Sequence, residues 1–181
     1  MTEYLESFAP ELTQRIRVLV LGSMPGIQSL KEGRYYAHSR NRFWPVVSQV
    51  LELSATAPYP ERVQALADTG VGVWDVIRSC RRQGSLDSSI VPGSEVLNDF
   101  SELLRVYPNI RAFAFNGQKA FHLFEKDITP GLASPSPVAL LALPSTSPAN
   151  ASWSVSRLVS RWRQIRDYLD ETGPSSTQAG C

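Results

Sequence analysis

The segment from Tyr35 to Trp44 concentrates side chains that could do chemistry. Within ten positions it contains Tyr35, Tyr36, His38, Arg40, Asn41, Arg42, Phe43 and Trp44. Aromatic rings can stack on a planar ligand, a primary amide offers a donor beside an acceptor, and guanidinium groups bind phosphates. The arginines give the segment the local positive charge that a phosphate-binding face needs, although they could equally be solvated surface charges. The mixture is unusual for a connecting loop and indicates a ligand site.

The elements that would position this segment alternate along the chain. Near-continuous apolar runs bounded by turn residues, the pattern of strands buried on both faces of a parallel sheet, occur at 16–23, 71–77, 110–116 and 138–144. Apolar residues at helical spacing lie between and after them, at 43–51, 63–67, 96–104, 118–124 and 153–170. This order predicts an α/β fold, a three-layer α/β/α sandwich around a mainly parallel four-stranded sheet with right-handed crossovers.

Loops after three of these strands should meet at one edge of the sheet. They are Gly22–Gly26, Asn116–Gly117 and Pro144–Pro148. In such sheets the ligand site lies beyond the carboxyl ends of the strands. The first loop has neither the lysine of a P-loop nor the third glycine of a dinucleotide site. It is either a plain turn or a turn whose glycines bring backbone close to a ligand.

Length and composition exclude several classes of protein. The 181 residues predict one domain over 1–171, followed by a small polar tail at 172–181 that we expect to be disordered. Two cysteines, Cys80 and Cys181, cannot build a disulfide framework, and no Cys/His spacing resembles a metal site, so we expect no metal and no cofactor. There is no bilayer-length apolar run and no signal peptide, which predicts a cytoplasmic protein without a membrane partner. We also expect a monomer. Only two histidines occur, and neither belongs to a nucleophile-elbow pattern.

Three separated motifs together resemble a known family. They are LGSMPGIQSL…YYAHSRNRFW, AFNGQKAF and LPSTSPAN, in this order between Leu19 and Asn150. They look like family 6 of the uracil-DNA glycosylase superfamily, the hypoxanthine-DNA glycosylases. The resemblance implies the parallel-sheet sandwich already expected and a reaction on damaged DNA, duplex or single-stranded. A deaminated base, hypoxanthine first, is flipped out and its N-glycosidic bond is hydrolysed.

The resemblance also implies residues that bind the base. Tyr36 would stack on it, with Tyr35 or Phe43 as alternative platforms. Asn116 would read its edge, because hypoxanthine presents O6 and N1–H side by side and a primary amide matches that pair. Gly22 would let the backbone approach the base.

The catalytic residues that the resemblance implies are Asn41 and Ser23. Asn41 would orient water and stabilise an oxocarbenium-like transition state, unless it is simply a helix N-cap. Ser23 stands where the mismatch-specific uracil-DNA glycosylases have an asparagine, and its hydroxyl is a poor base. A carboxylate, Asp75 or Asp87, is the alternative that could activate water.

Contacts to DNA are expected from hydroxyl, imidazole, amide and guanidinium groups of the first and third motifs. These residues are His38, Arg40, Arg42, Ser145, Thr146, Ser147 and Asn150. No lysine occupies a position that resembles a Schiff-base site, which predicts a monofunctional enzyme. Two alternatives stay open: removal of uracil or xanthine on the same scaffold, and a non-catalytic DNA-binding module.

Overall fold

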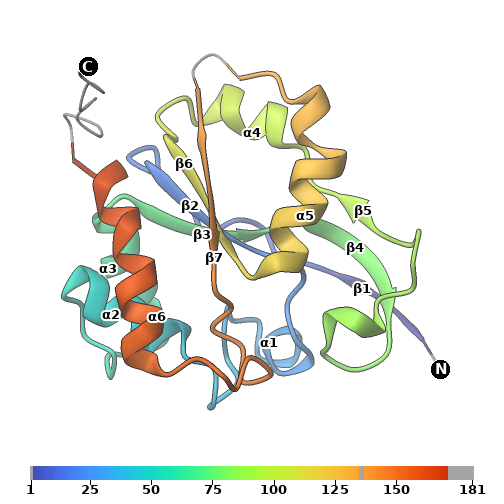
Figure 1. Ribbon diagram of the computed structural model, residues 1–181, viewed down its shortest axis with the longest axis horizontal. Coiled ribbons are helices and arrows are strands. Elements are labelled where there is room, and N and C mark those ends of the chain that lie inside the picture. Colours follow the sequence, from blue (N-terminus) through green and yellow to red (C-terminus); the bar gives the residue numbers. More distant parts are fainter. Residues whose placement is uncertain (1, 135–136, 171–181) are drawn as a thin grey trace, which may run out of the picture.

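A parallel sheet of four strands forms the centre of the protein. The structure is a computed structural model that describes residues 2–134 and 137–170 (Figure 1). The strands lie in the order β3-β2-β6-β7 and are β2 (Val18–Gly22), β3 (Val71–Asp75), β6 (Ala112–Asn116) and β7 (Ala139–Leu143). All three neighbouring pairs are parallel. The four predicted strands are confirmed, whereas the tail expected at 172–181 lies outside the described residues.

Helices cover both faces of this sheet. The six α-helices of the described chain are α1 (Ile27–Glu32), α2 (Phe43–Leu51), α3 (Tyr59–Asp68), α4 (Phe100–Val106), α5 (Gln118–Asp127) and α6 (Val155–Trp162). Short 3-10 turns lie at Asp87–Ser89, Thr129–Gly131 and Arg163–Tyr168, the last continuing α6. Figure 1 shows α2, α3 and α6 on one side of the sheet and α4 and α5 on the other. The predicted three-layer sandwich is therefore confirmed.

Alternate residues of each strand build two separate cores. Val18 and Val20 pack with α2, α3 and α6, while Leu19 and Leu21 pack with α4 and α5. Both sets are fully buried. This two-sided burial is the physical reason that the strand reads as one continuous apolar run.

A second, antiparallel sheet was not predicted. It has the order β1-β4-β5 and consists of β1 (Glu3–Glu6), β4 (Ile77–Arg82) and β5 (Val96–Leu97). The run predicted as one strand at 71–77 therefore divides at Val76. The helix predicted from 96 is wrong at its start, because Val96 and Leu97 pair with β4 and α4 begins only after Asp99, whose carboxylate accepts the backbone N–H of Glu102 at 2.9 Å.

The amino end of α2 tolerates a proline. Pro45 lies in the first turn, where a backbone N–H has no partner within the helix, so its missing donor costs no helical hydrogen bond. Among the helices of the described part of the chain, none is long and apolar enough to cross a bilayer.

Candidate active site

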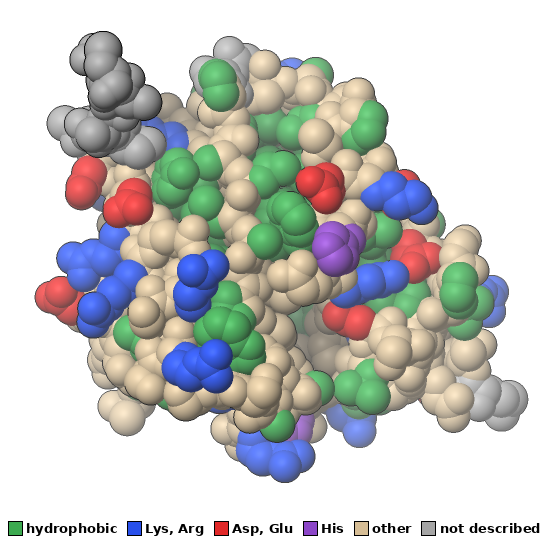
Figure 2. All heavy atoms as spheres, in the orientation of Figure 1, with side chains coloured by type: hydrophobic (Ala, Val, Ile, Leu, Met, Phe, Trp, Pro, Cys, Tyr) green, Lys and Arg blue, Asp and Glu red, His purple; other side chains and the backbone are tan. Residues whose placement is uncertain are grey.

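A cavity of about 470 Å³ opens where β2, β3 and β6 end. The strand ends supply Gly22, Asp75 and Asn116. The remaining walls come from the loops after β2, β4 and β7, from α1 and from the segment between α1 and α2. Figure 2 shows a hollow on this side of the molecule, near α1 and the amino end of α5, with acidic and basic side chains beside it. Its place at the carboxyl ends of parallel strands is the one that the fold predicts for a ligand.

Tyr36 forms an aromatic wall of the cavity. Its ring stacks on Phe43, with the ring centroids 3.8 Å apart and the planes inclined by 20°. The backbone of Tyr36 lies in the left-handed region at φ 56°, a conformation that costs a tyrosine about 1–3 kcal/mol. Phe43 is fully buried as the first residue of α2 and does not line the cavity. Phe43 therefore packs behind Tyr36 and does not face the cavity. It does not occupy the place of an alternative stacking platform, which the sequence had suggested for it.

Thr146 joins the second and third motifs to the first. Its hydroxyl donates to Asn41 Oδ1 at 3.0 Å and accepts from Asn116 Nδ2 at 2.9 Å. Its backbone N–H donates to Asn116 Oδ1 at 2.8 Å. Thr146 is fully buried, so it does not contact DNA directly, contrary to what the sequence had led us to expect. Its hydrogen bonds instead hold the two asparagines in place.

Asn41 lines the cavity with part of its amide already engaged. Its Oδ1 accepts the backbone N–H of Phe43 at 2.9 Å in addition to the Thr146 hydroxyl. The N-cap position of α2 is Arg42, and no side chain caps it there. The Nδ2 group of Asn41 has no hydrogen-bond partner in the described part of the chain, which leaves two amide hydrogens for a ligand or water.

Arg42 holds the loop that follows β7. Its guanidinium donates to the carbonyl oxygens of Thr146, Ser147, Asn150 and Trp153, at 2.6 Å for Ser147 and 2.9 Å for Asn150. A phosphate contact was expected here, but these donors are directed into the protein. Asn150, also expected at the DNA, closes the same loop by donating from Nδ2 to Ser145 O at 2.9 Å.

Four other residues that we expected to contact DNA lie at the rim of the cavity and are at least partly exposed. His38 and Arg40 are exposed, and His38 Nδ1 accepts the backbone N–H of Arg40 at 3.1 Å. Ser145 and Ser147 are partly exposed and line the opposite side.

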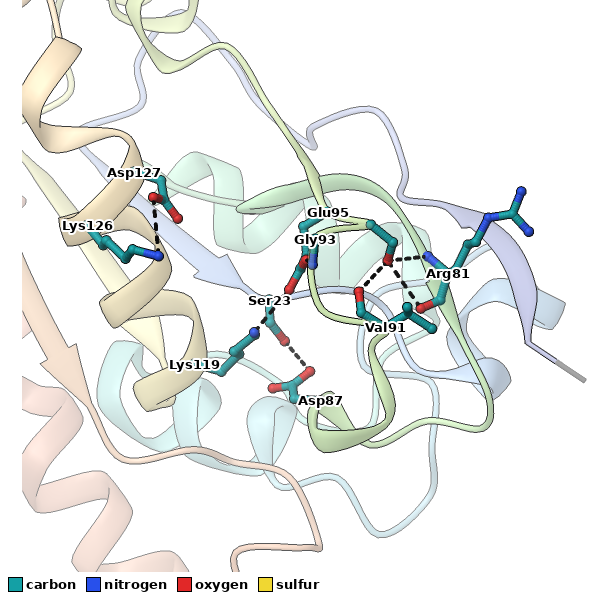
Figure 3. A network of polar contacts seen from close by, with 10 residues as sticks. Ser23, Arg81, Asp87, Val91, Gly93, Glu95, Lys119, Lys126 and Asp127 are labelled. Atoms are coloured by element: carbon teal, nitrogen blue, oxygen red, sulfur yellow. Dashed lines mark hydrogen bonds and ion pairs between the residues drawn. The ribbon is translucent and has the colours of Figure 1, made fainter.

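Ser23 donates a short hydrogen bond across the cavity wall. Its Oγ lies 2.6 Å from Asp87 Oδ1, and Figure 3 shows this pair beside the ion pair of Lys119 with Glu95. Burial raises the pKa of Asp87, which the Ser23 hydroxyl partly opposes. The contact fastens the loop after β4 to the loop after β2.

Asp75 is a fully buried carboxyl at the inner wall. An added Cβ at Gly22 would lie 2.6 Å from Asp75 Oδ1, so a glycine at position 22 is what allows this carboxyl to lie against β2. Burial raises the pKa of Asp75 to about 7. A buried titrating carboxyl in a cavity is a feature of functional sites.

A comparison with protein families agrees with this arrangement. Residues 9–168 match the model of the Uracil DNA glycosylase superfamily. The chain belongs to the uracil DNA glycosylase superfamily. The resemblance drawn from the three motifs is thereby confirmed at the level of the superfamily.

Two curated relatives of this superfamily member come from species of Methanosarcina. A protein of Methanosarcina acetivorans named hypoxanthine DNA glycosylase is 33% identical over 87% of this chain and 95% of its own length. A protein of the same name from Methanosarcina barkeri is 34% identical over 64% of this chain and 72% of its own length.

A solved structure shares the fold. The solution NMR structure of a protein from Methanosarcina acetivorans superposes with a TM-score of 0.77 at 30% identity, covering 92% of this chain and 99% of that one.

The sequence missed one wall of the cavity in this superfamily member. Ser85, Leu86 and Asp87, in the loop after β4, line it, and Ser85 Oγ accepts the backbone N–H of Ile27 at 3.0 Å. Asp87 had been noted only as a possible carboxylate, because nothing in the sequence reveals the antiparallel sheet that brings this loop to the site. No group of three or more His, Cys, Asp or Glu side chains suited to a metal ion occurs among the residues described.

Proposed function

We propose that this protein is a monofunctional DNA glycosylase that flips a deaminated base, hypoxanthine in the first place, into the cavity and hydrolyses its N-glycosidic bond. The observation that supports this most strongly is the contact of Thr146 with Asn41 and Asn116, which ties three separated motifs to one cavity. The cavity volume of about 470 Å³ is of the size that suits a small planar ligand. Both curated relatives are named for hypoxanthine.

The aromatic wall is assigned to binding. A flipped base loses the stacking of the duplex, and a ring recovers roughly 1–3 kcal/mol of it. Tyr36 is the ring in the cavity wall that stacks face to face on another ring, Phe43, whereas Tyr35 meets Phe8 edge to face. Asn116 keeps one amide hydrogen beyond its bonds to Thr146 and remains a proposed contact of the base.

We assign Asn41 to positioning the water molecule that attacks the sugar. Because its Oδ1 accepts two hydrogen bonds, Asn41 turns amide hydrogens towards the cavity, and these can donate to the oxygen of an attacking water. An amide cannot take a proton, so Asn41 cannot act as a general base, and the rate depends on how readily the purine departs with the electron pair of the broken bond. The ring carbonyl of hypoxanthine spreads that charge, which makes it a better leaving group than adenine. The role of Ser23 is to hold the first loop through Asp87.

The substrate is proposed to be damaged DNA, duplex or single-stranded, held at the rim by Arg40, His38, Ser145 and Ser147. A glycosylase gathers most of its contacts from phosphates, which fix its position without reading sequence. We further propose that residues 1–171 form a single domain and that the protein acts as a monomer in the cytoplasm without a cofactor.

Three oligonucleotides test this proposal, each carrying one deoxyinosine, deoxyuridine or deoxyxanthosine. They are incubated with excess protein, and the abasic product is cleaved with alkali. We expect deoxyinosine to react fastest. A faster reaction of deoxyuridine or deoxyxanthosine would assign the other specificity, and binding of all three without excision would show a non-catalytic DNA-binding module.

A further inference from the structure

Three buried polar groups of the cavity wall have no hydrogen-bond partner. They are Asp75 Oδ2 and the hydroxyl groups of Tyr35 and Tyr36, which lie near one another and near Asn116 but form no hydrogen bond of ordinary geometry with any described residue. Leaving a buried polar group unpaired costs about 1–3 kcal/mol, so such groups are rare unless a ligand or water completes them. Their meeting in one cavity indicates that the ligand supplies the missing donors and acceptors.

The position of Asp75 is fixed by its backbone and by Gly22. Asp75 is the last residue of β3 and pairs in register with Gly22 of β2. Its carbonyl oxygen accepts the Asn98 side chain at 2.8 Å, and the next residue, Val76, donates its N–H to Gly22 O at 2.8 Å. The carboxyl is therefore held rigidly at the strand end where a flipped base would lie.

The charged and titratable groups around Asp75 come from three elements. Tyr35 and Tyr36 precede α2, Arg82 ends β4, and Asp87 lies in the loop after β4. Burial raises the pKa of Asp75 to about 7, Asp87 adds to this, and the Tyr35 hydroxyl and Arg82 oppose it. Arg82 donates to Pro25 O at 2.5 Å and forms no ion pair with Asp75. The carboxyl thus has the Tyr35 hydroxyl nearby but no cation paired with it, and burial outweighs the groups that favour its ionised form.

We propose that Asp75 recognises the base edge as a neutral carboxylic acid, its carbonyl oxygen accepting from N1–H of hypoxanthine and its O–H donating to O6. The proposal rests on the glycosylase function above and names the group that reads the substrate. A neutral carboxyl and a primary amide present the same donor and acceptor pair. The Oδ1 atom and one amide hydrogen of Asn116 are already bound to Thr146, so Asn116 cannot offer the base a free donor and acceptor pair, whereas Asp75 Oδ2 forms no hydrogen bond of ordinary geometry.

The departure of the purine explains why the neutral form of the Asp75 carboxyl is needed. The C1′–N9 bond breaks with its electron pair going to the purine, water oxygen bonds to C1′, and the proton lost by that water ends on the purine. During this step negative charge develops on O6. A donor fixed at O6 stabilises that charge in a buried site, whereas a carboxylate there would repel it. The proton of Asp75 stays on Asp75 throughout.

The Asp75→Asn variant tests this assignment, because it keeps a donor and an acceptor but does not titrate. Single-turnover excision from a deoxyinosine duplex is measured from about pH 6 to about pH 9. The wild-type rate is expected to fall by about tenfold per unit above the pKa of Asp75. Asp75→Asn should lack this fall and lie within about tenfold of wild type at the acidic end. Ionisation of the base itself affects both proteins equally and is removed by taking their ratio.

Two further variants complete the test. Asp75→Leu, which fills the site but offers no hydrogen bond, should be about 10²-fold or more slower than wild type at the acidic end. Asp87→Asn is the matched control, a second, partly buried carboxyl that lines the same cavity, and should keep the alkaline fall. An inactive Asp75→Asn would show that the carboxylate acts as a base, and coinciding profiles for wild type and Asp75→Asn would show that Asp75 does not read the base. Either result overturns the proposal.

A binding measurement separates this inference from the proposed function. The affinity for a duplex with non-cleavable 2′-fluoro-deoxyinosine should weaken above neutral pH in the wild type and stay constant in Asp75→Asn. If the wild type excises hypoxanthine but the two affinities change together, only the role of Asp75 is wrong. If the wild type neither excises nor shows this pH-dependent affinity, the proposed function and the role of Asp75 fail together.

Discussion

The two ends of the Asn41 amide have different tasks. Its oxygen is bound by Phe43 N–H and by the Thr146 hydroxyl, which fixes the plane of the amide. Its nitrogen has no hydrogen-bond partner among the described residues and can donate to a molecule in the cavity. The two readings of this residue from sequence, a helix-terminal hydrogen bond and a catalytic amide, therefore do not exclude each other, because each uses a different atom.

The stability of the protein should report the titration of Asp75. Its pKa is about 7 in the folded protein and 3.8 as the ordinary value, so folding favours the protonated form. The contribution is complete below the unfolded pKa and is lost as pH rises through the folded one. The free energy of unfolding of the wild type should thus fall between about pH 4 and about pH 7 because of this group, by up to roughly 4 kcal/mol.

Denaturant unfolding of wild type and Asp75→Asn at several pH values measures this effect. The variant has no carboxyl to ionise, so the stability difference between the two should grow in favour of the variant as pH rises across that interval. A difference that does not change with pH would mean that Asp75 is already ionised in the folded protein.

At the scale of elements, the loop from 145 to 153 depends on one side chain that precedes α2. Arg42 binds four carbonyl oxygens of this loop and its continuation, and hydrogen bonds to a charged donor contribute about 1.5–3 kcal/mol each when lost. We predict that Arg42→Gln lowers the free energy of unfolding by at least about 2 kcal/mol. It should also slow excision, because Thr146 would no longer hold Asn41 and Asn116.

Chemical denaturation checks this prediction, with Arg40→Gln as the control. Arg40 lies two positions away, is exposed, and its guanidinium contacts no described residue by a hydrogen bond or ion pair. If Arg42→Gln and wild type were equally stable, Arg42 would not hold the loop, and the original expectation that it contacts DNA would stand.

The elements differed in how well the sequence predicted them. The four strands of the parallel sheet were predicted because burial on both faces leaves a continuous apolar run, as in β2 and β6. The antiparallel sheet was missed because β4 contains a buried arginine, Arg82, and β5 has only two residues. Neither strand carries a local signal, since each depends on pairing with a distant partner.

The same limit applies to the candidate site. The rule that ligands bind at strand ends brought Gly22, Asn116 and Ser145 to one cavity in advance. It could not say that Arg42 and Thr146 face inward, because the direction of a side chain is decided by hydrogen-bond partners more than 100 residues away. Nor could it show that Asp75 lacks a partner.

At the scale of the whole molecule, the small net charge of +1 leaves binding of DNA to local clusters. Arg40 is exposed at the cavity rim, so Arg40→Ala should weaken binding to DNA of any sequence. It should also flatten the slope of log affinity against log salt by about one phosphate contact.

Equilibrium binding at several salt concentrations measures that slope. Arg105→Ala, an exposed arginine on α4 paired with Glu102, serves as the control and should leave the slope unchanged. A slope that is the same in Arg40→Ala and wild type would place Arg40 away from the DNA.

The most direct test of the account is single-turnover reaction of wild type and Asn41→Ala with a duplex containing one deoxyinosine, followed by identification of both products. The account predicts free hypoxanthine and a strand that breaks only after alkali, as hydrolysis without lyase action requires. Asn41→Ala should react about 10²–10⁴-fold more slowly with unchanged duplex affinity, the range for loss of a positioned catalytic group. Excision by Asn41→Ala at the wild-type rate, or no release of hypoxanthine by the wild type, would contradict it.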